Sequence, residues 1–148
     1  MHLTLHPERA WRLEQHLRHL SAEDWLPMWD DNGNVLDGIS GMHGVRGYHV
    51  NRDTFIGADY VRMSPGSRFP LHSHDGDHEI YFVMGEGFVH INGEDIGVQA
   101  GHLIHIPAEY PHGIWVPETA DFPLIFVAMG YPHKRVDAHD RMKSLSAE

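Results

Sequence analysis

The feature that most constrains the fold is a series of short apolar runs, separated by turn residues, in the part of the chain that follows Tyr48. The runs are Phe55–Met63, Glu79–Met84, Phe88–Asn92, Leu103–Ile106, Gly113–Val116 and Leu124–Met129. Gly, Pro, Asn or Asp lies between them, and Asn92-Gly93 is a typical hairpin turn. Runs spaced by roughly ten residues are typical of a β-sandwich or barrel, and not of alternating βα units. We therefore expect an all-β fold.

The length of 148 residues fits one domain, which we divide into three parts. Residues 1–47 are expected to hold an N-terminal helix over Pro7–Leu20, where apolar side chains recur at helical spacing, and then a Gly-rich loop. That loop, residues 38–47, is either a surface loop or a flap over a binding site, with His43 as its contact. Residues 48–130 are the expected barrel. Residues 131–148 are a polar tail, expected as a helix or frayed end on the outside.

Charge and composition exclude several classes of partner and chemistry. The chain has 11 Lys and Arg against 21 Asp and Glu, a net charge of −10, which argues against nucleic acid and anionic membranes as partners. Cysteine is absent, so disulfides, thiolate ligands and thiol nucleophiles are excluded. The first residues have no basic region followed by an apolar one, and no apolar run is long enough to span a membrane. We expect a cytoplasmic protein.

Histidines and a glutamate gather in the stretch from Gly66 to Glu79. His72 and His74 are two residues apart, so on a strand both side chains point to the same face. Glu79 follows a turn that contains Gly76, and a further ligand is expected from the His-rich segment 101–112. Three imidazoles and one carboxylate would suit Fe(II), Mn(II), Ni(II), Co(II) or Zn(II). The sequence therefore predicts a divalent transition-metal site.

The two segments together resemble the two sequence motifs of the cupin superfamily. The first motif, G-x5-H-x-H-x(3,4)-E-x6-G, is matched by Gly66, His72, His74 and Glu79. The second, G-x5-P-x-G-x2-H-x3-N, is matched by Gly101, Pro107 and His112. The resemblance covers about residues 55–129 and implies a double-stranded β-helix (jelly-roll) barrel. It also implies that the metal ligands are His72, His74, Glu79 and His112.

The sequence departs from these motifs at several positions. Five residues separate Gly85 from Glu79, and seven separate Gly87 from it, where the motif has six. Glu109 and Val116 stand where the second motif has Gly and Asn. These positions are not metal ligands in the family, so the departures put the hairpin register in doubt and leave the ligand set intact.

Four further residues near the first motif are candidates with two possible roles. Tyr81 lies two residues after Glu79 and is expected to point inward, either as a packed barrel residue or as a proton donor or base beside the metal. His78 is expected to point the opposite way, at the surface or in a turn. Arg62 and Arg68 flank the motif and would either hold a substrate carboxylate or be solvated surface residues.

The resemblance implies a metal-dependent enzyme that acts on a small molecule. The favoured reaction is that of an Fe(II)-type dioxygenase acting on a carbonyl, enol or catechol-like substrate. The alternatives are a redox-neutral lyase or isomerase that uses Tyr81 for proton transfer, and a ligand-binding cupin without turnover. We also expect a homodimer that buries Trp11 or the segment Trp25–Trp29 against its partner.

Overall fold

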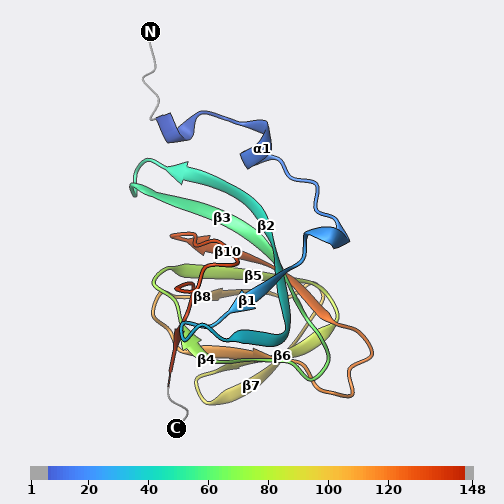
Figure 1. Cartoon of the computed structure of the whole chain (residues 1–148). Helices are drawn as coiled ribbons and strands as arrows, with labels where there is room; N and C mark the ends of the chain where they lie inside the picture. Colours follow the sequence, from blue (N-terminus) through green and yellow to red (C-terminus); the bar gives the residue numbers. More distant parts are fainter. Residues whose placement is uncertain (1–6, 146–148) are drawn as a thin grey trace.

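The computed structural model describes residues 7–145 and consists mainly of two antiparallel sheets (Figure 1). The first sheet has the strand order β1-β2-β3-β10-β5-β8 and the second has the order β11-β4-β9-β6-β7. The strands are β1 (Leu26–Trp29), β2 (Val35–His49), β3 (Thr54–Met63), β4 (Arg68–Ser73), β5 (Asp77–Met84), β6 (Glu86–Ile91), β7 (Glu94–Gln99), β8 (Leu103–Ile106), β9 (His112–Trp115), β10 (Leu124–Tyr131) and β11 (Lys143–Ser144). The predicted all-β jelly-roll is confirmed.

The core lies between the two sheets and follows from the alternation of side chains along each strand. In β10 every second residue is buried, beginning with Leu124. The rings of Phe82 on β5 and Phe126 on β10 meet edge to face, with centroids 5.5 Å apart. Val89 on β6 and Ile114 on β9 contribute from the second sheet. This shared core fixes which face of each strand points inward.

The expected helix over Pro7–Leu20 is wrong. The structure has only a 3-10 turn, η1 (Pro7–Arg9), and one α-helical turn, α1 (Leu13–His16); a second 3-10 turn, η2 (Ala22–Asp24), follows. Trp11 is 67% exposed, so the apolar side of this segment is not packed into the core. A short helix without tertiary packing is marginal in water, which explains the loss. No helix within residues 7–145 is long and apolar enough to cross a membrane.

The Gly-rich stretch 38–47 is neither a loop nor a flap, because it lies inside β2 and pairs with β3. Two of its glycines are needed where other groups approach the strand closely. A Cβ atom on Gly44 would lie 1.8 Å from the carbonyl oxygen of Ala58, and one on Gly41 would lie 2.1 Å from a methyl group of Val136. The glycines therefore allow close packing.

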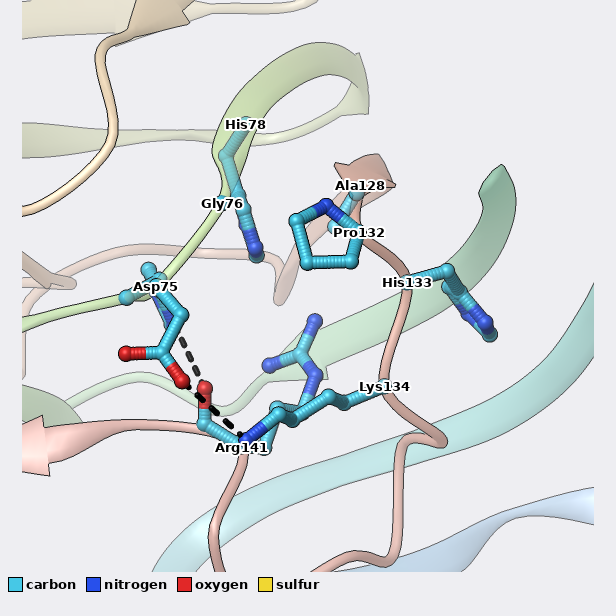
Figure 2. A pocket seen from close by; sticks show the side chains of 10 residues that line it. Asp75, Gly76, His78, Ala128, Pro132, His133, Lys134 and Arg141 are labelled. Carbon is cyan, nitrogen blue, oxygen red and sulfur yellow. Dashed lines mark hydrogen bonds and ion pairs between the residues drawn. The ribbon is translucent and has the colours of Figure 1, made fainter. Parts of the chain in front are cut away.

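The C-terminal segment is part of the barrel and not a tail on its outside. Val136 and Met142 are 0% and 2% exposed and belong to the core, and β11 pairs with β4. Lys134 binds Asp75, near the end of β4, through a 3.3 Å ion pair (Figure 2). The expectation of an outer helix or frayed end over the described residues 131–145 is wrong, because two apolar side chains anchor this segment.

Candidate metal centre

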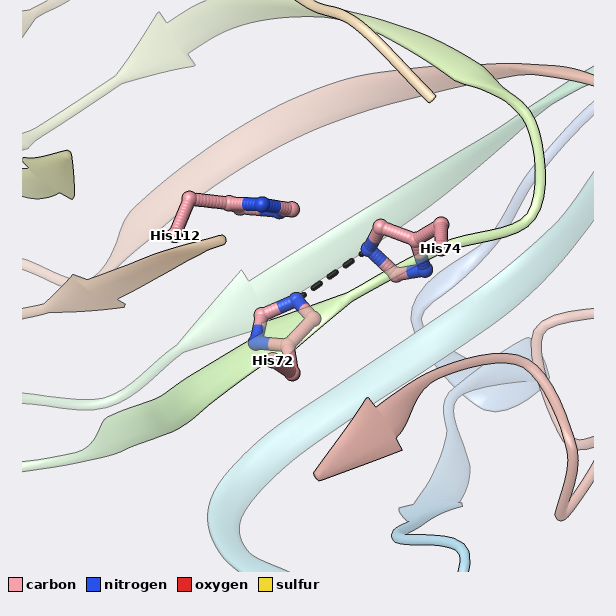
Figure 3. Close-up of side chains that lie close together, drawn as sticks. All are labelled: His72, His74 and His112. Atoms are coloured by element: carbon pink, nitrogen blue, oxygen red, sulfur yellow. Dashed lines mark hydrogen bonds between the residues drawn. The ribbon is translucent and has the colours of Figure 1, made fainter. Parts of the chain in front are cut away.

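Three of the predicted ligands come together inside the barrel (Figure 3). His72 lies on β4, His74 follows that strand, and His112 begins the neighbouring β9. His72 and His112 are paired in register across the two strands. All three side chains are buried, and one ring nitrogen of each lies within 4.8 Å of those of the other two. The structure thus confirms that these three histidines form one cluster.

Backbone carbonyl groups set the orientation of all three rings. The Nδ1 atom of His72 lies 2.6 Å from the oxygen of Pro70, and that of His74 lies 2.7 Å from the oxygen of Arg141. The Nδ1 atom of His112 lies 2.9 Å from the carbonyl oxygen two residues before it. A carbonyl only accepts hydrogen bonds, so each Nδ1 carries the proton and each Nε2 keeps its lone pair. Imidazoles that bind metals are commonly held in this way.

The distance between two of these nitrogens fits a shared ion. The Nε2 atoms of His72 and His74 are 3.1 Å apart (Figure 3). Since both Nδ1 atoms are protonated, neither Nε2 donates a hydrogen bond, and two lone pairs face each other. A cation between them removes that repulsion. Two nitrogens bound to one ion at about 2.0–2.1 Å are roughly 2.9–3.4 Å apart for bond angles near 90–110°.

Burial keeps the imidazoles of the cluster neutral. It is the main reason why the pKa of His74 falls to about 2, with the neighbouring His78 and the charge of Arg141 acting in the same direction. Burial also puts the pKa of His72 well below its usual value and lowers the pKa of His112. The neutral imidazole is the form that binds a metal, so no proton has to leave at neutral pH.

Glu79, the predicted carboxylate ligand, is not brought to the cluster. Its side chain is 55% exposed and lies 3.6 Å from Nδ1 of His105, on the outer face of the first sheet. The reason is the alternation along β5, where Ile80 and Phe82 are buried and Glu79 is exposed. The expectation that Glu79 faces the interior is therefore wrong.

His78 takes the inward position next to Glu79, contrary to its expected place at the surface. Its ring is buried and stacks on that of His74, with centroids 4.0 Å apart and planes 7° apart. Burial keeps the pKa of His78 well below its usual value. Its nitrogens are not among those that converge in the three-histidine cluster. The ring borders the cluster as a fourth neutral imidazole.

One spacing in the sequence contains the signal for His78. If His78 occupies the glutamate position of the first motif, three residues separate it from His74 and six separate it from Gly85. Both intervals then agree with the motif. The same position also shares a strand face with the apolar Ile80 and Phe82. The spacing to Gly85 therefore indicates that His78, and not Glu79, occupies the glutamate position of the first motif.

Tyr81 and the two flanking arginines also lie away from the cluster. Tyr81 is 43% exposed and pairs with Leu103 of β8 in register, on the same outer face as Glu79. The expectation that its hydroxyl lies beside the metal is wrong, for the same reason of strand alternation. The guanidinium of Arg62 stacks on Trp25 at 4.3 Å, and that of Arg68 lies over a second tryptophan ring at 5.7 Å.

The residue that sequence reasoning missed is Arg141. It lines a cavity beside the cluster together with His74 and His78. No local pattern points to it, because it lies in the polar segment after the last predicted strand. Its place in the site depends on the return of that segment to β4 through β11.

Comparison with known proteins agrees with this fold and site. Residues 59–128 match the model of the cupin domain family. Over 70 residues the chain is 36% identical to an oxalate-binding protein from Thermotoga maritima, which covers 47% of this chain and 56% of that protein. The chain spans just over half the length of the curated relatives it matches, 56% and 53%.

Two solved structures illustrate the similarity in fold. The polyketide cyclase RemF from Streptomyces resistomycificus superimposes with a TM-score of 0.62 at 17% identity, over 89% of this chain and 87% of that one. A predicted oxalate decarboxylase from Thermotoga maritima gives a TM-score of 0.55 at 22% identity, over 78% of this chain and 100% of that one. At these identities the similarity shows the fold alone.

Two antiparallel sheets around a buried cluster of histidines define a jelly-roll protein with a candidate metal centre. Residues 59–128 match the cupin domain family, and the motif spacing and the fold agree with that match.

Proposed function

We propose that the protein is a metal-dependent cupin enzyme whose divalent ion is held by His72, His74 and His112. The observation that carries the proposal is the shared geometry of the three rings, with Nδ1 of each held by a backbone carbonyl and one ring nitrogen of each within 4.8 Å of those of the other two. All three ligands are neutral, so they leave the charge of the ion uncompensated. His78 is the nearest further imidazole and the candidate for a fourth ligand.

We favour the reaction of an Fe(II)-type dioxygenase on a carbonyl, enol or catechol-like substrate. When bound, iron would orient such a substrate through its oxygen atoms and supply the redox chemistry. The chain's own part is to fix the three imidazoles and to exclude water; the ring of Phe69 lies 5.7 Å from that of His72. The exposed position of Tyr81 removes the proton-transfer residue on which the lyase or isomerase alternative depended.

A second candidate is the binding of oxalate or a similar small anion without turnover. The name of the relative from Thermotoga maritima favours it, at 36% identity over 70 residues. In this case the same three histidines would hold the ion, and the ion would hold the ligand. The two candidates differ in whether a bound molecule is converted.

Metal analysis of protein purified without added metal tests the shared part of both candidates. We expect about one ion per chain in the wild type and in Glu79→Gln, and a strong loss in His112→Ala, which circular dichroism should show to be folded. Full metal content in His112→Ala would contradict the ligand assignment, and so would the loss of metal in Glu79→Gln.

Oxygen consumption by the Fe(II)-loaded protein then separates the candidates. Catechols, β-diketones and 2-oxo acids are added in turn, with His112→Ala as the control. Substrate-dependent uptake supports the dioxygenase. Binding of oxalate by calorimetry, without uptake or product, supports the binding protein and rejects the dioxygenase.

A further inference from the structure

The cavity beside the histidine cluster contains a positively charged group without a hydrogen-bond acceptor. The side chain of Arg141 reaches into this cavity, which His74, His78 and His133 also line (Figure 2). Within residues 7–145, no group accepts a hydrogen bond from its guanidinium. The side chain is only partly buried, so a ligand can reach it. Five N–H donors are therefore available to an anion.

The backbone around Arg141 fixes this guanidinium relative to the proposed metal. The carbonyl oxygen of Arg141 is the acceptor for Nδ1 of His74, at 2.7 Å. The next residue, Met142, is 2% exposed in the core, and Lys143 then pairs with Ser73 in β11 and β4. One short segment thus orients a proposed ligand of the ion and carries the arginine. The proposed metal ion and the guanidinium of Arg141 are therefore positioned by the same segment.

The negative groups around the cavity already have partners. Asp59 is the carboxylate whose charge acts on Arg141, but its oxygens accept hydrogen bonds from the N–H of Gly44 at 2.9 Å and from Nε2 of His133 at 2.7 Å. At the rim, Asp75 forms ion pairs with Lys134 at 3.3 Å and with the lysine of β11 at 2.6 Å. Neither carboxylate accepts a hydrogen bond from the guanidinium.

Burial disfavours the charged guanidinium, and a bound anion would offset that cost. Burial lowers the pKa of Arg141, and the charge of Asp59 acts against that shift. A guanidinium stays protonated at neutral pH even so, and a charged group with unpaired donors in a partly desolvated site costs free energy. The imidazoles of the cluster carry no negative charge that could offset the positive charge of Arg141.

The charge balance and the size of the cavity define the class of ligand. A divalent ion, one arginine and one aspartate leave a surplus of about two positive charges, which an anion would neutralise. The cavity measures about 10 Å³, which is room for one water-sized group. That space takes one oxygen of a carboxylate, and the two oxygens of a carboxylate match the guanidinium fork.

We propose that Arg141 is the specificity-determining residue of this cupin and binds a carboxylate of a small anionic substrate beside the metal ion. The inference rests on the proposed function and narrows its substrate class to molecules that carry a carboxylate next to an oxygen that can bind the ion. Neutral diketones and neutral catechols are outside this class.

Calorimetry with the Zn(II)-loaded protein tests the role of Arg141, with oxalate and malonate as anionic probes and oxamide as the neutral analogue of oxalate. We expect Arg141→Gln to weaken oxalate binding roughly 10–100-fold, the range for a lost hydrogen-bonded charge. Arg141→Lys keeps the charge without the guanidinium fork, so its affinity for oxalate should lie between those of the wild type and Arg141→Gln. Arg135→Gln is the matched control, because Arg135 is an exposed arginine of the same segment that binds His43. Affinity for oxamide should be weak in all four proteins.

The metal content of the same samples separates this inference from the proposed function. Unchanged oxalate affinity in Arg141→Gln with full zinc overturns the role of Arg141 alone, as does a wild type that binds zinc but neither anion. A wild type that binds no zinc overturns the proposed function. In that case the role of Arg141 is tested without metal. It stands if oxalate raises the Tm of the metal-free wild type and of Arg135→Gln but not that of Arg141→Gln, and any other result overturns it. If Arg141→Gln does not fold, Arg141→Lys decides by the same measurements.

Discussion

At the scale of single residues, the important property of the site is that its nitrogen donors are all neutral. β5 turns His78 to the interior and Glu79 to the outside, so no carboxylate of that strand reaches the three-histidine cluster. A bound divalent ion would keep its full charge in a partly desolvated cavity, where attraction for anions is strong. For this reason Arg141 and the proposed metal ion would attract the same anionic ligand.

The role of Tyr81 gives a prediction at this scale. Tyr81→Phe should leave metal content unchanged and turnover within about twofold of the wild type, because the hydroxyl is on the outer face of the sheet. Loss of a positioned acid or base would cost roughly 10²–10⁴-fold. Steady-state kinetics of Tyr81→Phe beside His112→Ala checks this, and a hundredfold drop in the tyrosine variant would contradict it.

The buried histidines also predict how the stability of the metal-free protein depends on pH. In the folded state the pKa values of His72, His74, His78 and His112 lie below the usual 6.5. The unfolded chain therefore binds protons first as the pH falls through 6.5, and protonation favours unfolding. The free energy of unfolding should fall below pH 6.5 by up to about 1.4 kcal/mol per pH unit for each imidazole.

Urea unfolding of EDTA-treated protein between pH 7.5 and 5.5 measures this slope. His78→Asn removes one buried imidazole and should reduce the slope, whereas His102→Gln, at an exposed position, should not. A free energy of unfolding that is constant or rises over this range would contradict the prediction.

At the scale of elements, turns between strands depend on glycines for two separable reasons. Gly93 in the turn between β6 and β7 and Gly85 in the turn between β5 and β6 both have left-handed backbone angles, with φ of 73° and 81°. A Cβ atom at Gly93 would meet nothing within 4 Å, whereas one at Gly85 would lie 2.2 Å from the carbonyl oxygen of Pro123. Of these two glycines, only Gly85 lies so close to a neighbouring segment that a side chain would clash with it.

The pair Gly85→Ala and Gly93→Ala separates backbone strain from steric clash. Both variants should lose about 1 kcal/mol of unfolding free energy from the left-handed conformation. Gly85→Ala should lose at least about 2 kcal/mol more, because a backbone carbonyl cannot move away without disturbing β10. Chemical denaturation measures both values, and equal losses would show that the approach of Pro123 is unimportant.

At the scale of the whole molecule, the apolar surfaces open to a partner are the N-terminal segment, where Trp11 is 67% exposed, and the outer face of the first sheet. Trp25 stacks with Arg62, and Trp29 stacks on His139 at 4.9 Å, so both already pack within the chain. The outer face of the first sheet instead exposes Leu103 at 65%, together with Tyr81 and Met84. Exposed apolar clusters of this kind are typical of interfaces.

We therefore keep the prediction of a homodimer and assign its contact to this sheet face. Light scattering at micromolar concentration should give about twice the chain mass of 16.9 kDa. Leu103→Glu should shift the protein toward the monomer without loss of metal, and Leu17→Glu, which changes the exposed N-terminal segment, should not. A wild-type monomer, or dissociation caused by Leu17→Glu alone, would reject this interface.

The sequence by itself determined the features that depend on local pattern. The apolar runs predicted the all-β barrel, Asn92-Gly93 predicted a hairpin turn directly after β6, and the two-residue step from His72 to His74 predicted a shared site. Turn chemistry and the two-residue period of a strand act over a few residues, so they can be read from the chain. Family motif spacing added His112.

The tertiary structure decided three points, and for one of them, the position of His78, the spacing to Gly85 also carries a signal. The Gly-rich stretch 38–47 is a strand because β3 is available to pair with it, and Arg141 enters the site because Val136 and Met142 anchor the segment around it. The choice of His78 over Glu79 was fixed by the pairing of β5 with β10 and β8, which sets the face that meets the core. A shift of one residue exchanges the two faces of a strand, and long-range burial selects between them.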